Sequence, residues 1–129
     1  LGTGAEARVL RDPTRGGVAT TLNEFVEGTT LGIELYEDKV PVRDQVRAAC
    51  DMLGLDPLYC ANEGKLLAVV AADDAERVLS STREAEEGRD AAIIGRVSTG
   101  YPGKLVMDTA FGGKRILQKL TGAQLPRIC

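Results

Sequence analysis

The chain ends in a cysteine, Cys129, whose thiol could act as a nucleophile and carry a group from one place to another. A chain terminus is the most mobile part of a polypeptide, so such a thiol can enter a pocket and leave it again. The thiolate is the reactive form, and the positive charge of Arg127 favours it while the terminal carboxylate opposes it. Pro126 suits an extended arm. These residues predict a mobile arm over residues 122–129, and the alternative is a terminus that simply ends in cysteine.

A second group of functional side chains stands just before a segment with helical spacing of apolar residues. It combines a carboxylate, a hydroxyl, a guanidinium and two glycines, namely Asp12, Thr14, Arg15, Gly16 and Gly17. The N-terminus of a helix attracts anions, glycines let the backbone approach phosphate, and an arginine can hold phosphate with two hydrogen bonds. The pattern fits a phosphate site and fits a glycine turn before a helix equally well. It is not a Walker A loop.

The third candidate is Glu63, in the sequence Asn-Glu-Gly-Lys that precedes the most apolar segment of the chain. A carboxylate at the end of a buried strand can be partly desolvated, which raises its pKa and makes it a useful base. The chain contains no histidine, so proton transfer must use a carboxylate, a lysine, a tyrosine or a thiol. Glu63 is one candidate for such a base, and a solvated turn is the more common explanation for a glutamate beside a glycine.

The elements that must position these side chains follow from the apolar pattern. We expect a turn over residues 10–13 and a brief, extended segment over residues 59–61. We expect a basic turn over residues 111–115, which either binds an anion or simply lies on the surface. We expect a helix that residues 14–17 lead into and that runs through about residue 26, a second helix over 40–53, and a third that Asp73 caps and that fades into residues 83–90. We expect strands over residues 31–36, 65–71, 91–97 and 104–107. After Lys65, residues 66–71 are all apolar, as in the interior of a sheet. The alternation without strict βαβ repetition predicts one α/β layered domain over residues 1–121, a mixed β-sheet flanked by helices.

Composition restricts the functions that are available. The chain has 129 residues, 43% of them hydrophobic and 27% charged, which is typical of a globular domain. A net charge of −3, without a basic stripe, argues against a nucleic-acid partner, and no apolar run is long enough to span a membrane. The three cysteines are widely spaced and form no CxxC pair, which predicts reduced thiols, a cytoplasmic location and no metal site. Cys50 and Cys60 are expected in or near the core, without an assigned function. The absence of an initiator methionine suggests part of a longer protein.

Together, the motifs at residues 12–17, 61–66 and 125–129 resemble those of the HypE family of hydrogenase maturation proteins, and occur in the same order. The similarity extends from about residue 8 to the terminus and includes residues 91–95. The ending Pro-Arg-Ile-Cys is the specific part, whereas the glycine motif alone is not. The chain resembles the carboxyl-terminal half of these proteins, which belong to the aminoimidazole ribonucleotide synthetase superfamily.

The resemblance implies an ATP-dependent carbamoyl dehydratase. A carbamoyl group would arrive on Cys129 from the carbamoyltransferase HypF, and ATP would drive its dehydration to a thiocyanate. The cyanide would then pass to iron on the HypC–HypD scaffold. Glu63 would be the base, and the phosphate end of the ATP cleft would be lined by Asp12, Thr14, Arg15, Gly16, Gly17 and Asn62. An amino-terminal domain outside this chain would supply most of the ATP and Mg²⁺ site and form a homodimer.

Two other functions fit the residues. The chain could be half of another ATP-dependent synthetase or kinase of the superfamily, which would not need a terminal cysteine. It could also be a non-catalytic adaptor that docks on a metal-assembly scaffold. Replacing Cys129 by serine separates these possibilities from the dehydratase.

Overall fold

The computed structural model describes residues 4–121, and these residues form two β-sheets and three α-helices. The larger sheet has four strands in the order β4-β2-β5-β6. Its members are β2 (Gly32–Tyr36), β4 (Gly95–Ser98), β5 (Leu105–Asp108) and β6 (Lys114–Leu117). Strands β2 and β5 run parallel, whereas β4–β2 and β5–β6 are antiparallel, so the predicted mixed sheet is confirmed. The expected arm and Cys129 lie outside the described residues.

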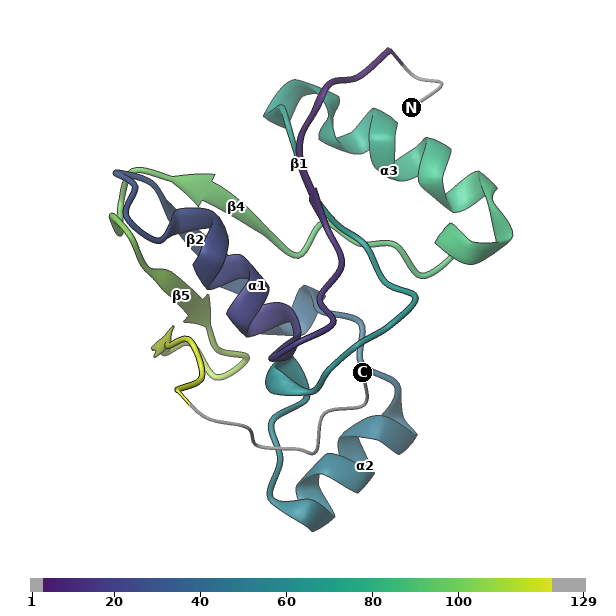
Figure 1. The fold of residues 1–129 in the computed structure, drawn as a ribbon. Coiled ribbons are helices and arrows are strands. Elements are labelled where there is room, and N and C mark those ends of the chain that lie inside the picture. Colours follow the sequence, from purple (N-terminus) through teal and green to yellow (C-terminus); the bar gives the residue numbers. More distant parts are fainter. Residues whose placement is uncertain (1–3, 122–129) are drawn as a thin grey trace.

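The core lies between this sheet and helix α1 (Gly17–Val26), which crosses it in Figure 1. The helix contributes Ala19, Leu22 and Val26, whose spacing puts them on one face. The sheet contributes alternate residues of its two central strands together with the end of β6: Ile33, Leu35, Leu105, Met107 and Leu117. Ala19, Leu35 and Leu105 are fully buried. The start of α1 is therefore held on a rigid, close-packed support.

The smaller sheet pairs β1 (Ala7–Arg11) with β3 (Leu67–Val70) in antiparallel orientation. The register places Arg11 opposite Leu67. Helices α2 (Asp44–Leu53) and α3 (Ala75–Glu84) lie at opposite ends of the molecule in Figure 1. Short 3₁₀ helices complete the chain: η1 (Glu37–Lys39), η2 (Pro57–Tyr59), η3 (Ala72–Asp74) and η4 (Glu86–Gly88). No helix among residues 4–121 is long and apolar enough to cross a membrane.

Several local predictions were wrong. Residues 65–71 do not form an interior strand, because β3 pairs with β1 alone and Leu66 is 65% exposed. Asp73 does not cap α3, because it lies inside η3. The N-cap residue of α3 is Asp74, and its side chain makes no capping hydrogen bond. Residues 114–117 form strand β6, so the basic segment is only partly a turn.

The boundaries of other elements also shifted. The turn expected over residues 10–13 begins inside β1, whose pairing with a distant strand leaves no local signal. Helix α2 begins at Asp44 because residues 40–43 contain Pro41 and stay non-helical. Tyr59 ends a 3₁₀ helix instead of opening an extended segment.

Candidate functional site

The structure brings two of the predicted motifs together. Because β1 and β3 are antiparallel, the chain leaving Arg11 and the chain entering Leu67 are at the same end of the small sheet. Beyond that end, the backbone N–H of Asn62 donates to the carbonyl oxygen of Pro13 at 3.1 Å. Pro13 is itself buried. The loop of residues 12–16 and the loop of residues 60–64 therefore form one joined surface at the start of α1.

The two glycines of the motif are required by this junction. Both have left-handed backbone angles, with φ of 68° at Gly16 and 64° at Gly17. A Cβ on Gly17 would lie 2.5 Å from the carbonyl oxygens of Leu58 and Cys60, so the absence of a side chain lets α1 pack on η2. Backbone angles and packing therefore require glycine at both positions, whether or not a phosphate binds there.

The N-terminus of α1 offers hydrogen-bond donors to an anion. Within the described residues, no side chain caps this helix and its first turn carries no acidic residue. One turn into the helix, the hydroxyl of Thr20 is buried, the residue being 9% exposed, and has no hydrogen-bond partner among the described residues. A Cβ on Gly16 would lie 2.2 Å from that oxygen, so the hydroxyl sits directly beneath the glycine loop. A buried polar group without a partner needs an explanation.

Thr20 is a candidate that sequence reasoning missed. A threonine beside Ala19 on the buried face of a helix was the available signal, but threonine is also common where its hydroxyl bonds back to the preceding turn. Thr21 does so, donating to the Gly17 carbonyl at 3.0 Å. Only the packed structure distinguishes the two hydroxyls.

The remaining predicted side chains lie on the surface of the joined loops. Asp12 and Arg15 are exposed, and Thr14 and Asn62 are half-buried. Glu63 is exposed, beside Gly64, whose φ of 70° makes the turn. The partial burial expected at this carboxylate is therefore not present within the domain. A base at this position needs a cover from outside the described residues.

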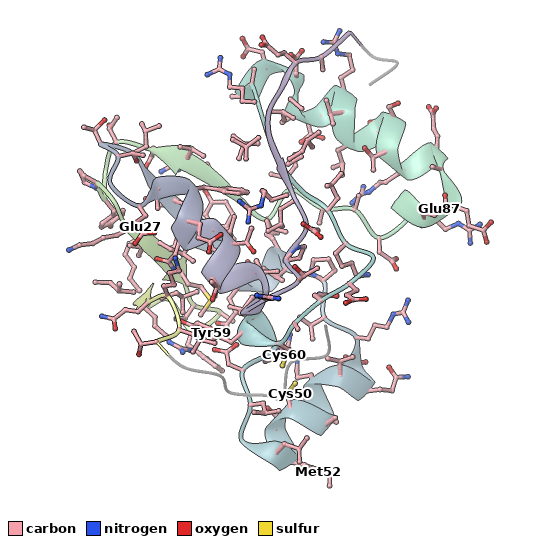
Figure 2. All side chains as sticks on the ribbon, in the orientation of Figure 1. Glu27, Cys50, Met52, Tyr59, Cys60 and Glu87 are labelled. Carbon is pink, nitrogen blue, oxygen red and sulfur yellow. The ribbon has the colours of Figure 1, made fainter. Side chains whose placement is uncertain are left out.

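The last described residues are fastened near the same structure. Asn23 of α1 donates to the Leu117 carbonyl at 2.9 Å, and the Tyr59 hydroxyl donates to the Gln118 carbonyl at 2.7 Å. Lys119 then lies 3.4 Å from Glu24 of α1 and 3.5 Å from Glu27, the residue that follows this helix. Burial raises the pKa of Tyr59, although the charge of Arg115 opposes the shift. Residues 117–119 therefore lie against η2 and the second half of α1, and Figure 2 labels Tyr59 and Glu27, two of the residues that hold them.

The donor set fits the phosphate groups of a nucleotide. The first-turn N–H groups of α1, the unpartnered hydroxyl of Thr20 and the exposed Arg15 are suited to anionic oxygens. Two cavities in the described region, of about 270 and 50 Å³, are lined by other residues. The described residues contain no cluster of three or more histidine, cysteine or acidic side chains able to hold a metal ion. The hydrogen-bond donors at the start of α1 therefore lie outside both cavities.

Residues 3–108 match the family described as AIR synthase related protein, C-terminal domain, and the chain belongs to that family. The mixed α/β fold, with its two sheets and three helices, is that of this class of domain.

Within the class, the chain is similar to HypE proteins, which confirms the resemblance found in the sequence. It is 54% identical over 124 residues to carbamoyl dehydratase HypE of Azotobacter vinelandii, covering 96% of this chain and 36% of the relative. A crystal structure of hydrogenase maturation protein HypE in complex with ATP aligns with a TM-score of 0.90 and 48% identity, over 100% of this chain and 39% of that one. The HypE–HypF complex aligns with a TM-score of 0.81 and 44% identity, over 87% and 36% of the two chains. This chain thus spans little more than a third of the length of the relatives it matches.

Proposed function

We propose that this chain is the carboxyl-terminal domain of an ATP-dependent carbamoyl dehydratase that makes the cyanide ligand of [NiFe]-hydrogenase. The observation that supports this most directly is the joined surface of residues 12–16 and 60–64. Through the bond from Asn62 to Pro13, the exposed carboxylate of Glu63 is held beside the donors at the start of α1. A base and an anion site side by side are what dehydration of a phosphate-activated amide needs.

The reaction removes the elements of water from a carboxamide that is attached to the sulfur of Cys129. ATP supplies the phosphoryl group that makes the carboxamide oxygen a good leaving group. Glu63 takes a proton from the amide nitrogen, with a lysine of the amino-terminal domain as a second candidate for that role. The N–H groups of α1, with Asp12, Thr14, Arg15, Gly16, Gly17 and Asn62 around them, orient the phosphate end, and the Thr20 hydroxyl gains a partner there. Mg²⁺ and most of the nucleotide are assigned to the amino-terminal domain.

Chain length is compatible with this placement of Cys129. The eight residues 122–129 can span at most about 28 Å. The described chain ends beside Glu24 of α1 and Glu27, which follows this helix, and the N-terminus of the helix is about 10–15 Å away at 1.5 Å per residue. The sulfur can therefore reach the joined loops and still have chain left to turn outward. We propose that residues 122–129 are a mobile arm, ordered by nucleotide, on a domain that ends at residue 121.

The proposed partners follow from the relatives. A HypE protein has been crystallised with HypF, so we assign HypF as the carbamoyl donor for Cys129. The HypC–HypD scaffold as cyanide acceptor, the homodimer and the cytoplasmic location belong to the same proposal. Each depends on the whole protein and not on this domain alone.

Mass spectrometry on the full-length protein tests the proposal. The protein is incubated with HypF, carbamoyl phosphate and ATP, and the Cys129 peptide is analysed with time. We expect the gain of one carbamoyl group and then an ATP-dependent loss of one water, with neither in Cys129→Ser. Glu63→Gln should keep the carbamoyl group without losing water. Glu87→Gln is the matched control, because Glu87 is exposed in η4, far from the joined loops in Figure 2.

Absence of any modification on Cys129 would contradict the proposal and favour the adaptor or another synthetase of the superfamily. Water loss in Glu63→Gln at the wild-type rate would remove Glu63 from the base role while leaving the carrier role of Cys129 intact.

A further inference from the structure

Two thiols that the proposed reaction does not use lie against each other. Cys50 is the buried residue of α2, with 6% of its surface exposed, and its neighbours in that helix face outward. Cys60 follows η2 and is half-buried. Figure 2 shows their sulfur atoms facing one another in the space between α2 and η2. Ten residues separate them along the chain, so the fold and not the sequence pattern makes them a pair.

The contacts of Cys60 show how the pair is held. Its thiol donates to the carbonyl oxygen of Asp56 at 3.5 Å, and its backbone N–H donates to Pro57 at 3.3 Å. On the other side, the Leu55 N–H donates to the Cys50 carbonyl at 2.9 Å, which fixes the turn that leaves α2. Burial raises the pKa of Cys60, and its hydrogen bond with Cys50 raises it further. The two thiols are therefore in hydrogen-bond contact with each other.

We propose that Cys50 and Cys60 form a dithiol site that a small-molecule disulfide, such as oxidised glutathione, converts to an intramolecular disulfide. Cys60 reacts first because it is the more exposed of the two. Its sulfur attacks the small disulfide, the S–S bond breaks, and one thiol leaves with the proton of Cys60. Cys50 then attacks the mixed disulfide on Cys60, and the second small thiol leaves with the proton of Cys50. The protein loses two electrons and two protons, and the small disulfide gains them.

The position of the two cysteines connects their oxidation to the loop of residues 60–64. The carbonyl oxygen of Cys60 is one of the two oxygens against which Gly17 packs. Two residues further on, Asn62 makes the backbone hydrogen bond to Pro13 that joins the loops. A disulfide would tie α2 to the segment that joins the two loops. Cys60 therefore lies at the start of the loop that carries Glu63, with its backbone against the first residue of α1.

Peptide mapping of the full chain after incubation with oxidised glutathione tests the site. Trypsin leaves Cys50 and Cys60 in one peptide, residues 48–65, because no lysine or arginine lies between Arg47 and Lys65. We expect this peptide to lose two hydrogens and to resist alkylation. Further cleavage before Asp51 and Asp56 should leave two fragments joined through the sulfurs until a reductant is added.

Two single variants separate the steps. Cys50→Ala should accumulate glutathione on Cys60, because the second step has no nucleophile, and Cys60→Ala should leave Cys50 at least tenfold less modified than Cys60 is in the first variant. Persistent glutathione on Cys60 in the wild type, or a disulfide from either residue to Cys129, would overturn the proposal. A wild-type chain that stays fully alkylatable under conditions that oxidise a control dithiol peptide would overturn it as well. None of these outcomes depends on the proposed dehydratase activity.

Discussion

Replacing Gly17 by alanine tests how the two loops are joined. The new Cβ would lie 2.5 Å from the carbonyl oxygens of Leu58 and Cys60 and 2.9 Å from the carbonyl carbon of Tyr59. Favourable non-bonded contacts lie at about 3.5 Å or more, so η2 or the start of α1 must move by about 1 Å. All three neighbours are backbone atoms, which cannot turn away as a side chain could. The variant therefore loses both stability and the alignment of Glu63.

The expected loss of unfolding free energy in Gly17→Ala has a backbone part and a packing part. A left-handed φ costs a residue with a Cβ about 1–2 kcal/mol, and the reduced freedom of the unfolded chain returns about 0.4–1 kcal/mol. Forcing a methyl group into a filled space adds about 1–3 kcal/mol. We expect Gly17→Ala to lower the free energy of unfolding by about 2–4 kcal/mol. Gly28→Ala is the matched control, because Gly28 has a φ of 72° and nothing within 4 Å of its added Cβ.

Urea unfolding followed by far-ultraviolet circular dichroism measures both variants. The control should lose about 1 kcal/mol or less, which is the backbone part alone. A loss for Gly17→Ala no larger than that for Gly28→Ala would refute the packing argument. In that case the glycine would be needed for its backbone angle, and the ligand would be the remaining reason for its position.

Three further predictions follow from single contacts. Thr20→Val removes a buried hydroxyl that has no partner among the described residues, so it should raise the free energy of unfolding of the domain in urea by about 1 kcal/mol. The same variant of the full-length protein should have a higher KM for ATP, and Thr20→Ser should restore the KM. Asn23→Ala breaks the bond to the Leu117 carbonyl and should lower stability by about 1–2 kcal/mol, with faster hydrogen exchange next to Leu117. The raised pKa of Tyr59 means that the unfolded chain loses its phenol proton first, so stability should fall as pH rises above about 10, and the fall should be smaller in Tyr59→Phe.

The sequence predicts best where an element is determined by its own apolar pattern. Helix α1 was predicted because Leu22, Phe25 and Val26 recur at helical spacing, and the same stripe packs on the sheet. Strands β2 and β5 were predicted for a similar reason, and both are almost wholly buried. Strand β1 was missed because its sequence Ala-Arg-Val-Leu-Arg becomes a strand only through pairing with β3, more than fifty residues away.

For the candidate site, too, the sequence shows some features and not others. The residue types of the two motifs were visible in the sequence, but their contact was not, because it depends on the register of Arg11 with Leu67 and on the bond from Asn62 to Pro13. The apolar segment that contains β3 led to the wrong prediction of an interior strand for a related reason. An apolar run indicates burial, yet it cannot say whether the covering element belongs to the same chain, and Leu66 remains 65% exposed.

The distribution of burial in the joined loops gives a physical reason for the proposal that a second domain completes the site. The groups that hold the loops in shape are internal, with Pro13 and Gly17 buried and the Asn62 N–H bonded. The groups that would do chemistry, Arg15 and Glu63, face outward. A carboxylate in water is a weak base, and burial is what raises its pKa toward neutrality. In the proposed enzyme, this domain would contribute position, and the amino-terminal domain would contribute the enclosure that excludes water. Because the joined loops are held by their own packing, the entropy cost of closing the proposed site would fall on the proposed arm that carries Cys129.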